Sequence, residues 1–218
     1  MTNQNPPFDA ATCHNHSMTA LLQYAKRNAH LDVTIPKDTP DSYVNLRDKG
    51  DFHSVRPFTY EDIRGYPMVF LTGTLPFTLT NGERQALYRY VMQDKGLIYG
   101  EDCHDHNGNR GGFHAPFREY MREIFGKPLT TLVFTHPIYH VPFTIDTDHI
   151  PYGDTRDHAP LEGIEVEPGR TGVIYTVNDY GDVWNPYLTY YKPERRDPAY
   201  RIGTNLYAYA ITFYHASP

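Results

Sequence analysis

Three short stretches of the sequence decide its fold. Residues 67–73 read PMVFLTG, residues 80–83 read TNGE, and residues 97–100 read LIYG. The first and third are continuous apolar runs, which are typical of strands buried on both faces of a parallel sheet. Between them, Thr80 followed three residues later by Glu83 is the capping box that starts a helix. Because parallel neighbours need a crossover helix, the three stretches predict a strand–helix–strand unit.

Further elements extend this unit in both directions along the chain. Apolar residues at helical spacing predict helices over residues 17–28, 116–125 and 199–213, with Ser17 as the cap of the first. Short apolar runs predict strands over residues 31–35, 129–134 and 171–177. Helices that alternate with strands in this way predict an α/β fold with a mostly parallel central sheet.

The length of 218 residues fits one domain. We expect residues 1–218 to form that domain, with loop excursions near residues 36–57 and 144–169, where prolines and charges interrupt the apolar pattern. The chain is large enough to bury a core without disulfides, and its two cysteines are too few for a disulfide scaffold.

Charge and hydropathy exclude two classes of partner. The net charge of -6 and the scattered Lys and Arg residues argue against nucleic acid, which needs clustered basic side chains. No apolar run approaches the roughly 20 residues that span a bilayer. The polar first residues have no apolar signal core, so the expected compartment is cytoplasmic by default and external if a leader was removed. An unidentified small molecule or protein remains as the expected partner.

Several motifs, in order along the chain, resemble a bacterial family described as domain of unknown function 4159. They include residues 66–73 (YPMVFLTG), 95–98 (KGLI), 136–140 (HPIYH), 178–181 (NDYG) and 203–206 (GTNL), and the resemblance covers residues 17–213. It implies a relative of the class I glutamine-amidotransferase-like folds, and therefore a flavodoxin-like three-layer sandwich. It implies no activity, because the chemistry of the family is unassigned.

A repeated motif indicates where a functional site lies in the fold. Residues 13–16 read CHNH and residues 103–106 read CHDH, so both are Cys-His-x-His. In an extended segment, residues two apart point to the same side, so both imidazoles of a motif can converge on one metal ion. The second motif follows a predicted strand and the first precedes a predicted helix. We therefore expect both at the carboxyl edge of the sheet, where open α/β folds bind ligands.

These residues predict a metal site at that edge. The candidate ligands are Cys13, His14, His16, Cys103, His104, His106, His136 and His140. The candidate catalytic carboxylates, as bases beside an open coordination position, are Asp102, Asp105 and Asp179. Imidazole and thiol ligands favour one divalent transition metal, namely zinc, iron or copper. The leading expectation is a metal-binding protein, with metal-dependent catalysis as an open extension of it.

Three alternatives stay open. Cys103 follows a strand, as the nucleophile of amidotransferases does, although its acidic neighbours disfavour the thiolate and small flanking residues are missing. A disulfide between Cys13 and Cys103 is the second alternative. The third is a non-catalytic module that binds protein or carbohydrate through a tyrosine-rich surface, formed by Trp184, Tyr187, Tyr190 and Tyr191.

Overall fold

A five-stranded sheet lies at the centre of the computed structural model. The structure describes residues 17–33, 47–48, 57–103, 112–146, 158–188 and 191–215, together with residues 148, 150, 151 and 153. The strands are β2 (Met68–Gly73), β4 (Leu97–Asp102), β5 (Thr130–Thr131), β6 (Glu162–Glu167) and β7 (Arg170–Thr176), in the spatial order β2-β4-β7-β6-β5. β2, β4 and β7 are parallel, whereas β6 is antiparallel to both of its neighbours. The predicted α/β class with a mostly parallel sheet core is confirmed.

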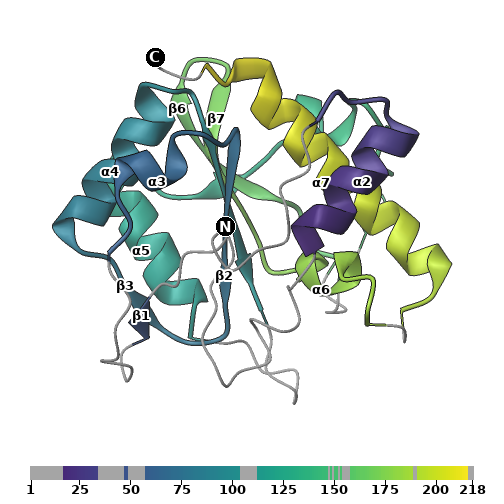
Figure 1. The fold of residues 1–218 in the computed structure, drawn as a ribbon, viewed down its shortest axis with the longest axis horizontal. Helices are drawn as coiled ribbons and strands as arrows, with labels where there is room; N and C mark the ends of the chain where they lie inside the picture. The colour runs from purple at the N-terminus through teal and green to yellow at the C-terminus, as the bar shows by residue number, and fades with distance from the viewer. Residues whose placement is uncertain are drawn as a thin grey trace.

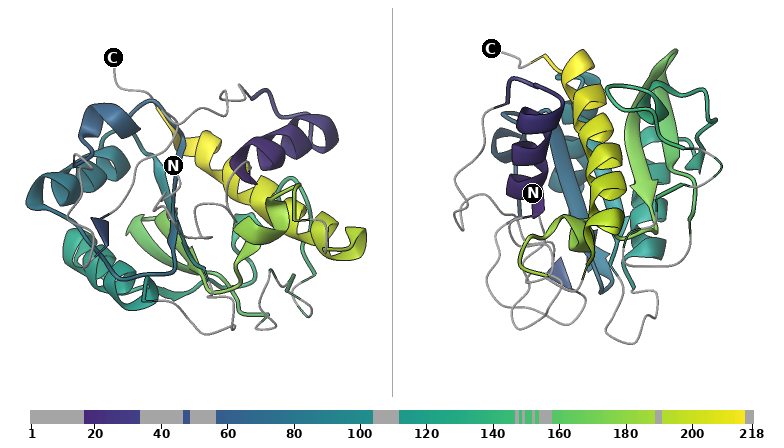
Figure 2. Two further views of the ribbon diagram at one scale, coloured as in Figure 1. Left: turned by 60° about the horizontal axis from the view of Figure 1, so that its bottom comes forward. Right: turned by 90° about the vertical axis from the view of Figure 1, so that its right-hand side faces the viewer.

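Helices cover both faces of this sheet (Figure 1). One face carries α3 (Tyr60–Ile63), α4 (Asn81–Met92) and α5 (His114–Phe125). The other carries α2 (Ser17–Asn28), the 3₁₀ helix η2 (Pro137–Tyr139), α6 (Tyr180–Trp184) and α7 (Pro193–Phe213). The two further views show the same separation of the helices by the sheet (Figure 2). A small ladder of β1 (Arg47–Asp48) and β3 (Phe77–Thr78) is separate from this sheet.

Strand alternation explains why the predicted strands are apolar throughout. Successive side chains of a strand point to opposite faces, so a strand with helices on both sides buries all of them. In β4, Tyr99 packs into the cluster beneath α2, α6 and α7, whereas Ile98 packs into the cluster beneath α4 and α5. All six residues of β2 and all six of β4 are buried accordingly.

The predicted helix start at Thr80 is confirmed. The Thr80 hydroxyl oxygen accepts a hydrogen bond from the backbone N–H of Glu83 at 3.3 Å, and the Glu83 carboxylate accepts one from the N–H of Thr80 at 2.7 Å. This reciprocal pair satisfies two of the N–H groups that a helix end leaves open. The predicted helix over residues 17–28 is likewise observed, as α2.

Three predicted elements differ from the structure. Residues 31–33 form no strand, and the strand expected over residues 129–134 is reduced to β5. The excursion expected over residues 144–169 contains β6, which pairs with β7 through a tight turn at Gly169. β6 was missed because its sequence, EGIEVE, mixes acidic and apolar residues, and the strand is only partly buried. Most of the excursion near residues 36–57 lies outside the described residues.

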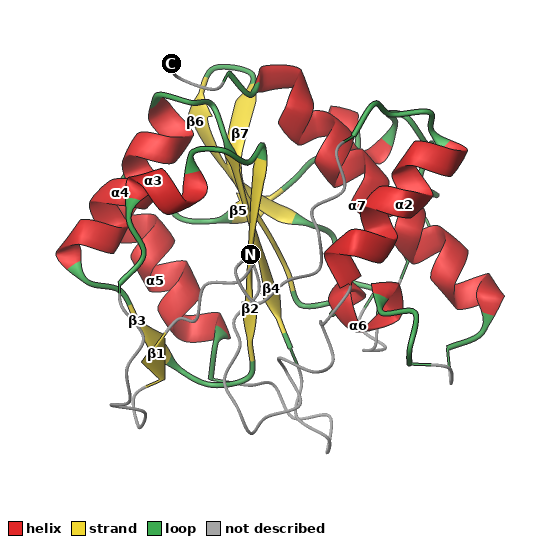
Figure 3. Ribbon diagram, in the orientation of Figure 1, coloured by secondary structure: helices red, strands yellow, loops and turns green. Residues whose placement is uncertain are grey.

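The connections of β4 and β7 form a topological switch point. These strands are parallel neighbours, but β4 leads to α5 on one face and β7 leads to α6 on the other (Figure 3). Where adjacent connections diverge in this way, the carboxyl ends of the strands leave a crevice that commonly holds ligands.

Within the described ranges, no helix combines the length and apolarity needed to cross a membrane.

A candidate metal site at the carboxyl edge of the sheet

Three ionisable side chains meet beyond the carboxyl ends of β4 and β7. Cys103 follows β4 directly, Asp179 precedes α6, and Asp182 lies in the first turn of α6. One ligand atom of each, the thiol sulfur or a carboxylate oxygen, lies within 4.8 Å of the other two, and all three residues are buried. Cys103 and Asp179 belong to the predicted site, whereas Asp182 was not predicted. We call this group the Cys103–Asp179–Asp182 cluster.

Glu101 attaches the start of α6 to the sheet. Its carboxylate accepts hydrogen bonds from the backbone N–H groups of Tyr180 at 2.9 Å and Gly181 at 2.7 Å, and a third from the hydroxyl of Tyr99. Burial raises the pKa of Tyr99 well above its ordinary value, so the phenol remains a donor. A carboxylate at a helix N-terminus is favoured by the helix dipole. Glu101 therefore holds the helix that carries Asp182.

Each of the two Cys-His-x-His motifs is joined in the chain to a residue beside α6. The Ser17 hydroxyl, at the start of α2, donates a hydrogen bond of 2.7 Å to the carbonyl oxygen of Gly181 in α6. Ser17 is the first residue of α2, and within the described residues its hydroxyl bonds α6 instead of capping α2 as predicted. Ser17 directly follows the first Cys-His-x-His motif, and Cys103 is the first residue of the second, so the chain joins both motifs to residues beside α6. The other predicted site residues of the two motifs lie outside the described residues: Cys13, His14, His16, His104, Asp105 and His106.

His136 and His140 lie elsewhere. The Nδ1 atom of His136 accepts a hydrogen bond from the N–H of Ile138 and caps η2, and its Nε2 atom lies 3.1 Å from the hydroxyl of Thr171. Thr171 is near the beginning of β7, about 16 Å of extended chain from the carboxyl end of that strand. The Nε2 atom of His140 lies 2.7 Å from the carbonyl oxygen of Phe134. The expectation that His136 reaches the carboxyl edge is therefore wrong, because the chain turns back after β5, and neither histidine belongs to the Cys103–Asp179–Asp182 cluster.

Asp102 is separated from the cluster by the sheet. Side chains alternate along β4, so Glu101 and Cys103 share one face and buried Asp102 faces the α4 and α5 side. On that side, His114 Nδ1 lies 2.7 Å from the Tyr175 hydroxyl. The structure thus does not bring the predicted carboxylates Asp102 and Asp179 together.

A bidentate ion pair lies on the same side as Asp102. Arg118 donates two hydrogen bonds, of 2.7 and 2.8 Å, to the Glu162 carboxylate. This pairing raises the pKa of Arg118 above its ordinary value. The ion pair joins α5 to β6, and both partners retain some solvent exposure.

The alternative aromatic surface is not formed as predicted. Trp184 is fully buried, and its indole N–H donates to the carbonyl oxygen of Ala199 at 2.8 Å. Tyr191 is also buried, whereas Tyr187 is 70% exposed. Tyr190 lies outside the described residues. Two of the four aromatic rings that we expected to bind a partner are therefore buried in the protein.

The nucleophile alternative is not favoured by the surroundings of Cys103. The thiol is buried and lies within 4.8 Å of ligand atoms of Asp179 and Asp182. Neighbouring carboxylates disfavour the thiolate that a cysteine nucleophile requires. A metal ion reverses this effect, because it binds the thiolate directly.

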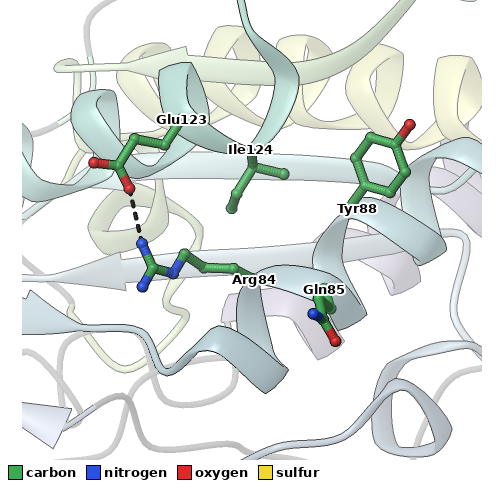
Figure 4. Close-up of a pocket in the computed structure, with 5 residues that line it drawn as sticks. All are labelled: Arg84, Gln85, Tyr88, Glu123 and Ile124. Carbon is green, nitrogen blue, oxygen red and sulfur yellow. Dashed lines mark hydrogen bonds and ion pairs between the residues drawn. The ribbon is translucent and has the colours of Figure 1, made fainter.

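A surface pocket lies between α4 and α5, on the opposite side of the sheet from the cluster (Figure 4). Its volume is about 290 Å³, and it is lined by Arg84, Gln85, Tyr88, Glu123 and Ile124. An ion pair of 2.9 Å between Arg84 and Glu123 spans the two helices there. This pocket contains no thiol or histidine, so the chemistry predicted from the sequence does not belong to it.

Comparisons with known proteins agree with the resemblance noted in the motifs. No curated protein matches the chain. The model of a family described as domain of unknown function matches residues 13–211, which include every residue of the cluster. Because this match covers most of the chain, the protein belongs to the DUF4159 family of unknown function.

Proposed function

We propose that the protein binds one divalent transition metal ion through Cys103, Asp179 and Asp182. The observation that carries this proposal is the convergence of a thiol and two carboxylates within 4.8 Å in a buried position. In a tetrahedral zinc site, bonds of about 2.0–2.3 Å place neighbouring ligand atoms about 3.5 Å apart. Small side-chain rotations would therefore bring the three atoms to ligand spacing.

Charge and ligand chemistry support the same proposal. Acidic groups that lie close together away from water repel one another, and a bound cation offsets that cost. A thiolate among the ligands favours zinc, iron or copper over magnesium or calcium, which prefer oxygen alone. The proposed metal is accordingly zinc, iron or copper, as the sequence predicts.

The helix that supplies Asp182 is held at both ends, which supports a preformed site. Glu101 binds its first N–H groups. At its other end, the guanidinium of Arg196 donates hydrogen bonds of 2.9 Å to the carbonyl oxygens of Val183 and Asn185. Rigid placement of ligands lowers the ordering cost of metal binding.

The proposal extends to residues known from sequence alone. His14, His16, His104 and His106 are the candidates for further coordination positions, because they adjoin Ser17 and Cys103 in the chain. Catalysis by a metal-bound water, with Asp105 as the candidate base, is the enzymatic extension of the proposal. We also propose a flavodoxin-like relation for the fold, supported by three neighbouring parallel strands with helices on both faces.

Metal content of the purified protein tests the proposal. We expect about one equivalent of a transition metal per chain by mass spectrometry, lost in Cys103→Ser and in Asp182→Asn. Asp197→Asn is the matched control, because Asp197 is a half-exposed carboxylate on α7 that pairs with Arg201. Protein that contains no metal and takes none up from zinc, iron or copper salts would contradict the proposal.

A further inference from the structure

Thr72 contributes a buried hydroxyl at the carboxyl end of β2. The residue is 1% exposed, and its Oγ1 atom has no hydrogen-bond partner within the described part of the chain. A buried hydroxyl without a partner costs free energy, so such a group usually has a ligand or water to bind. The position of Thr72 indicates which ligand that is.

The sheet register places this hydroxyl beside the cluster. Thr72 pairs in register with Glu101 of the neighbouring parallel strand, so both side chains lie on the face that carries α6. Cys103 follows Glu101 by two residues and lies on the same face, and its N–H donates to the carbonyl oxygen of Gly73. Thr72 is therefore a diagonal neighbour of Cys103 on the face of the sheet that carries the cluster.

Glu101, the neighbour of Thr72 in the sheet, does not hydrogen-bond the Thr72 hydroxyl. Its carboxylate already accepts three hydrogen bonds, from Tyr99, Tyr180 and Gly181. On its other side, Thr176 pairs in register with Glu101, and the Thr176 hydroxyl accepts from the N–H of Asn178 at 3.1 Å. Of the two threonines that flank Glu101, only Thr72 keeps an unused hydroxyl among the described residues.

We propose that the Thr72 hydroxyl hydrogen-bonds a small oxygen ligand on the metal ion, either water or a carboxylate that displaces it. This inference rests on the proposed function, since it requires metal at the cluster. It adds that the site keeps an exchangeable coordination position, as catalytic zinc sites do and closed structural sites do not. The chemical class of the molecule that exchanges with the bound water is therefore a small carboxylate.

Formate binding to the cobalt(II)-loaded protein tests this inference. Cobalt(II) reports its coordination by visible absorption, and formate is the smallest carboxylate that can replace a bound water. We expect formate to change the spectrum of the wild type. In Thr72→Val, which keeps the shape but removes the hydroxyl, formate affinity should fall about tenfold, as expected for one lost hydrogen bond. Cobalt affinity should stay within about twofold, because Thr72 is not a ligand.

Two controls accompany this test. Thr72→Ser keeps the hydroxyl and should bind formate as the wild type does. Thr204→Val removes another buried hydroxyl without a partner among the described residues, on α7, and should leave formate affinity unchanged. If Thr72→Val is unstable, Thr72→Ala removes the same hydroxyl without the branched methyl groups, and the tenfold loss is expected there.

The outcomes separate the two proposals. Cobalt bound with no response to formate in the wild type, or equal formate affinity in wild type and Thr72→Val, would overturn the inference and leave the metal site standing. Failure of the wild type to bind cobalt at all would overturn both.

Discussion

The carboxylate of Glu101 accepts a hydrogen bond of 2.7 Å from the backbone N–H of Gly181, which lies 80 residues further along the chain. This contact joins the end of β4 to the start of α6. Cys103 follows the first of these elements and Asp182 belongs to the second, so the hydrogen bond sets their relative position. The candidate site thus depends on a residue that is not itself one of its three ligands.

Replacing Glu101 should therefore destabilise the protein. In Glu101→Gln, an amide NH₂ replaces one acceptor oxygen and faces backbone N–H groups that need an acceptor. We expect a loss of about 2 kcal/mol in the free energy of unfolding, measured by urea denaturation. Glu165→Gln is the matched control, because Glu165 accepts a hydrogen bond of 2.9 Å from Gly169 at an exposed position and should cost less than about 0.5 kcal/mol. Equal effects of the two substitutions would contradict the role assigned to Glu101.

Gly100 of β4 should tolerate no side chain. A methyl group at this position would overlap the ring of Phe117 from α5, and both residues are buried. Gly100→Ala should cost about 1–3 kcal/mol of unfolding free energy through overpacking. By contrast, Gly82→Ala in α4 meets no atom closer than 4.0 Å and should stabilise the helix by about 0.5 kcal/mol. Thermal unfolding of both variants checks the pair, and a stable Gly100→Ala protein would show that α5 packs differently.

His136 should make stability depend on pH. Burial lowers its pKa, so the folded state favours the neutral ring that caps η2. Between that lowered pKa and the ordinary value of about 6.5, the unfolded chain binds more protons than the folded chain. Its contribution to stability is therefore complete above about pH 6.5 and is lost as the pH falls through this window.

The variant His136→Asn tests this dependence, since asparagine can still cap η2 but does not titrate. Urea denaturation at about pH 7.5 and about pH 5.5 should show a smaller difference in stability for the variant than for the wild type. All other groups are the same in both proteins, so their contributions cancel in the comparison. An unchanged difference would mean that protonation of His136 is not coupled to folding.

Much of the fold follows from local patterns in the sequence. The apolar runs of β2 and β4 leave no solvent face, and the Thr80–Glu83 pair marks the start of α4. β6 could not be predicted in the same way, because burial of its central residues depends on pairing with β7. Likewise, the strand expected over residues 129–134 is only the two residues of β5, and Val133 and Phe134 beyond it are exposed.

The candidate site was predictable only in part. Placement of Cys103 and Asp179 followed from the rule that carboxyl ends of parallel strands share one edge. Asp182 was missed although it lies three residues after Asp179, a spacing that brings side chains together once a helix begins. His136 was misplaced because no local pattern shows the chain reversing after β5. The hydrogen bonds from Glu101 to α6 join residues about 80 positions apart, a distance that no local pattern encodes.

Cobalt(II) titration of the wild type and of Cys103→Ser tests the central claim most directly. A thiolate bound to cobalt gives an intense near-ultraviolet charge-transfer absorption that oxygen and nitrogen ligands do not give. We predict this absorption in the wild type, saturating at about one cobalt per chain, and its loss in Cys103→Ser. Cobalt bound without the thiolate absorption, or an identical spectrum in Cys103→Ser, would contradict a metal site built on Cys103, Asp179 and Asp182.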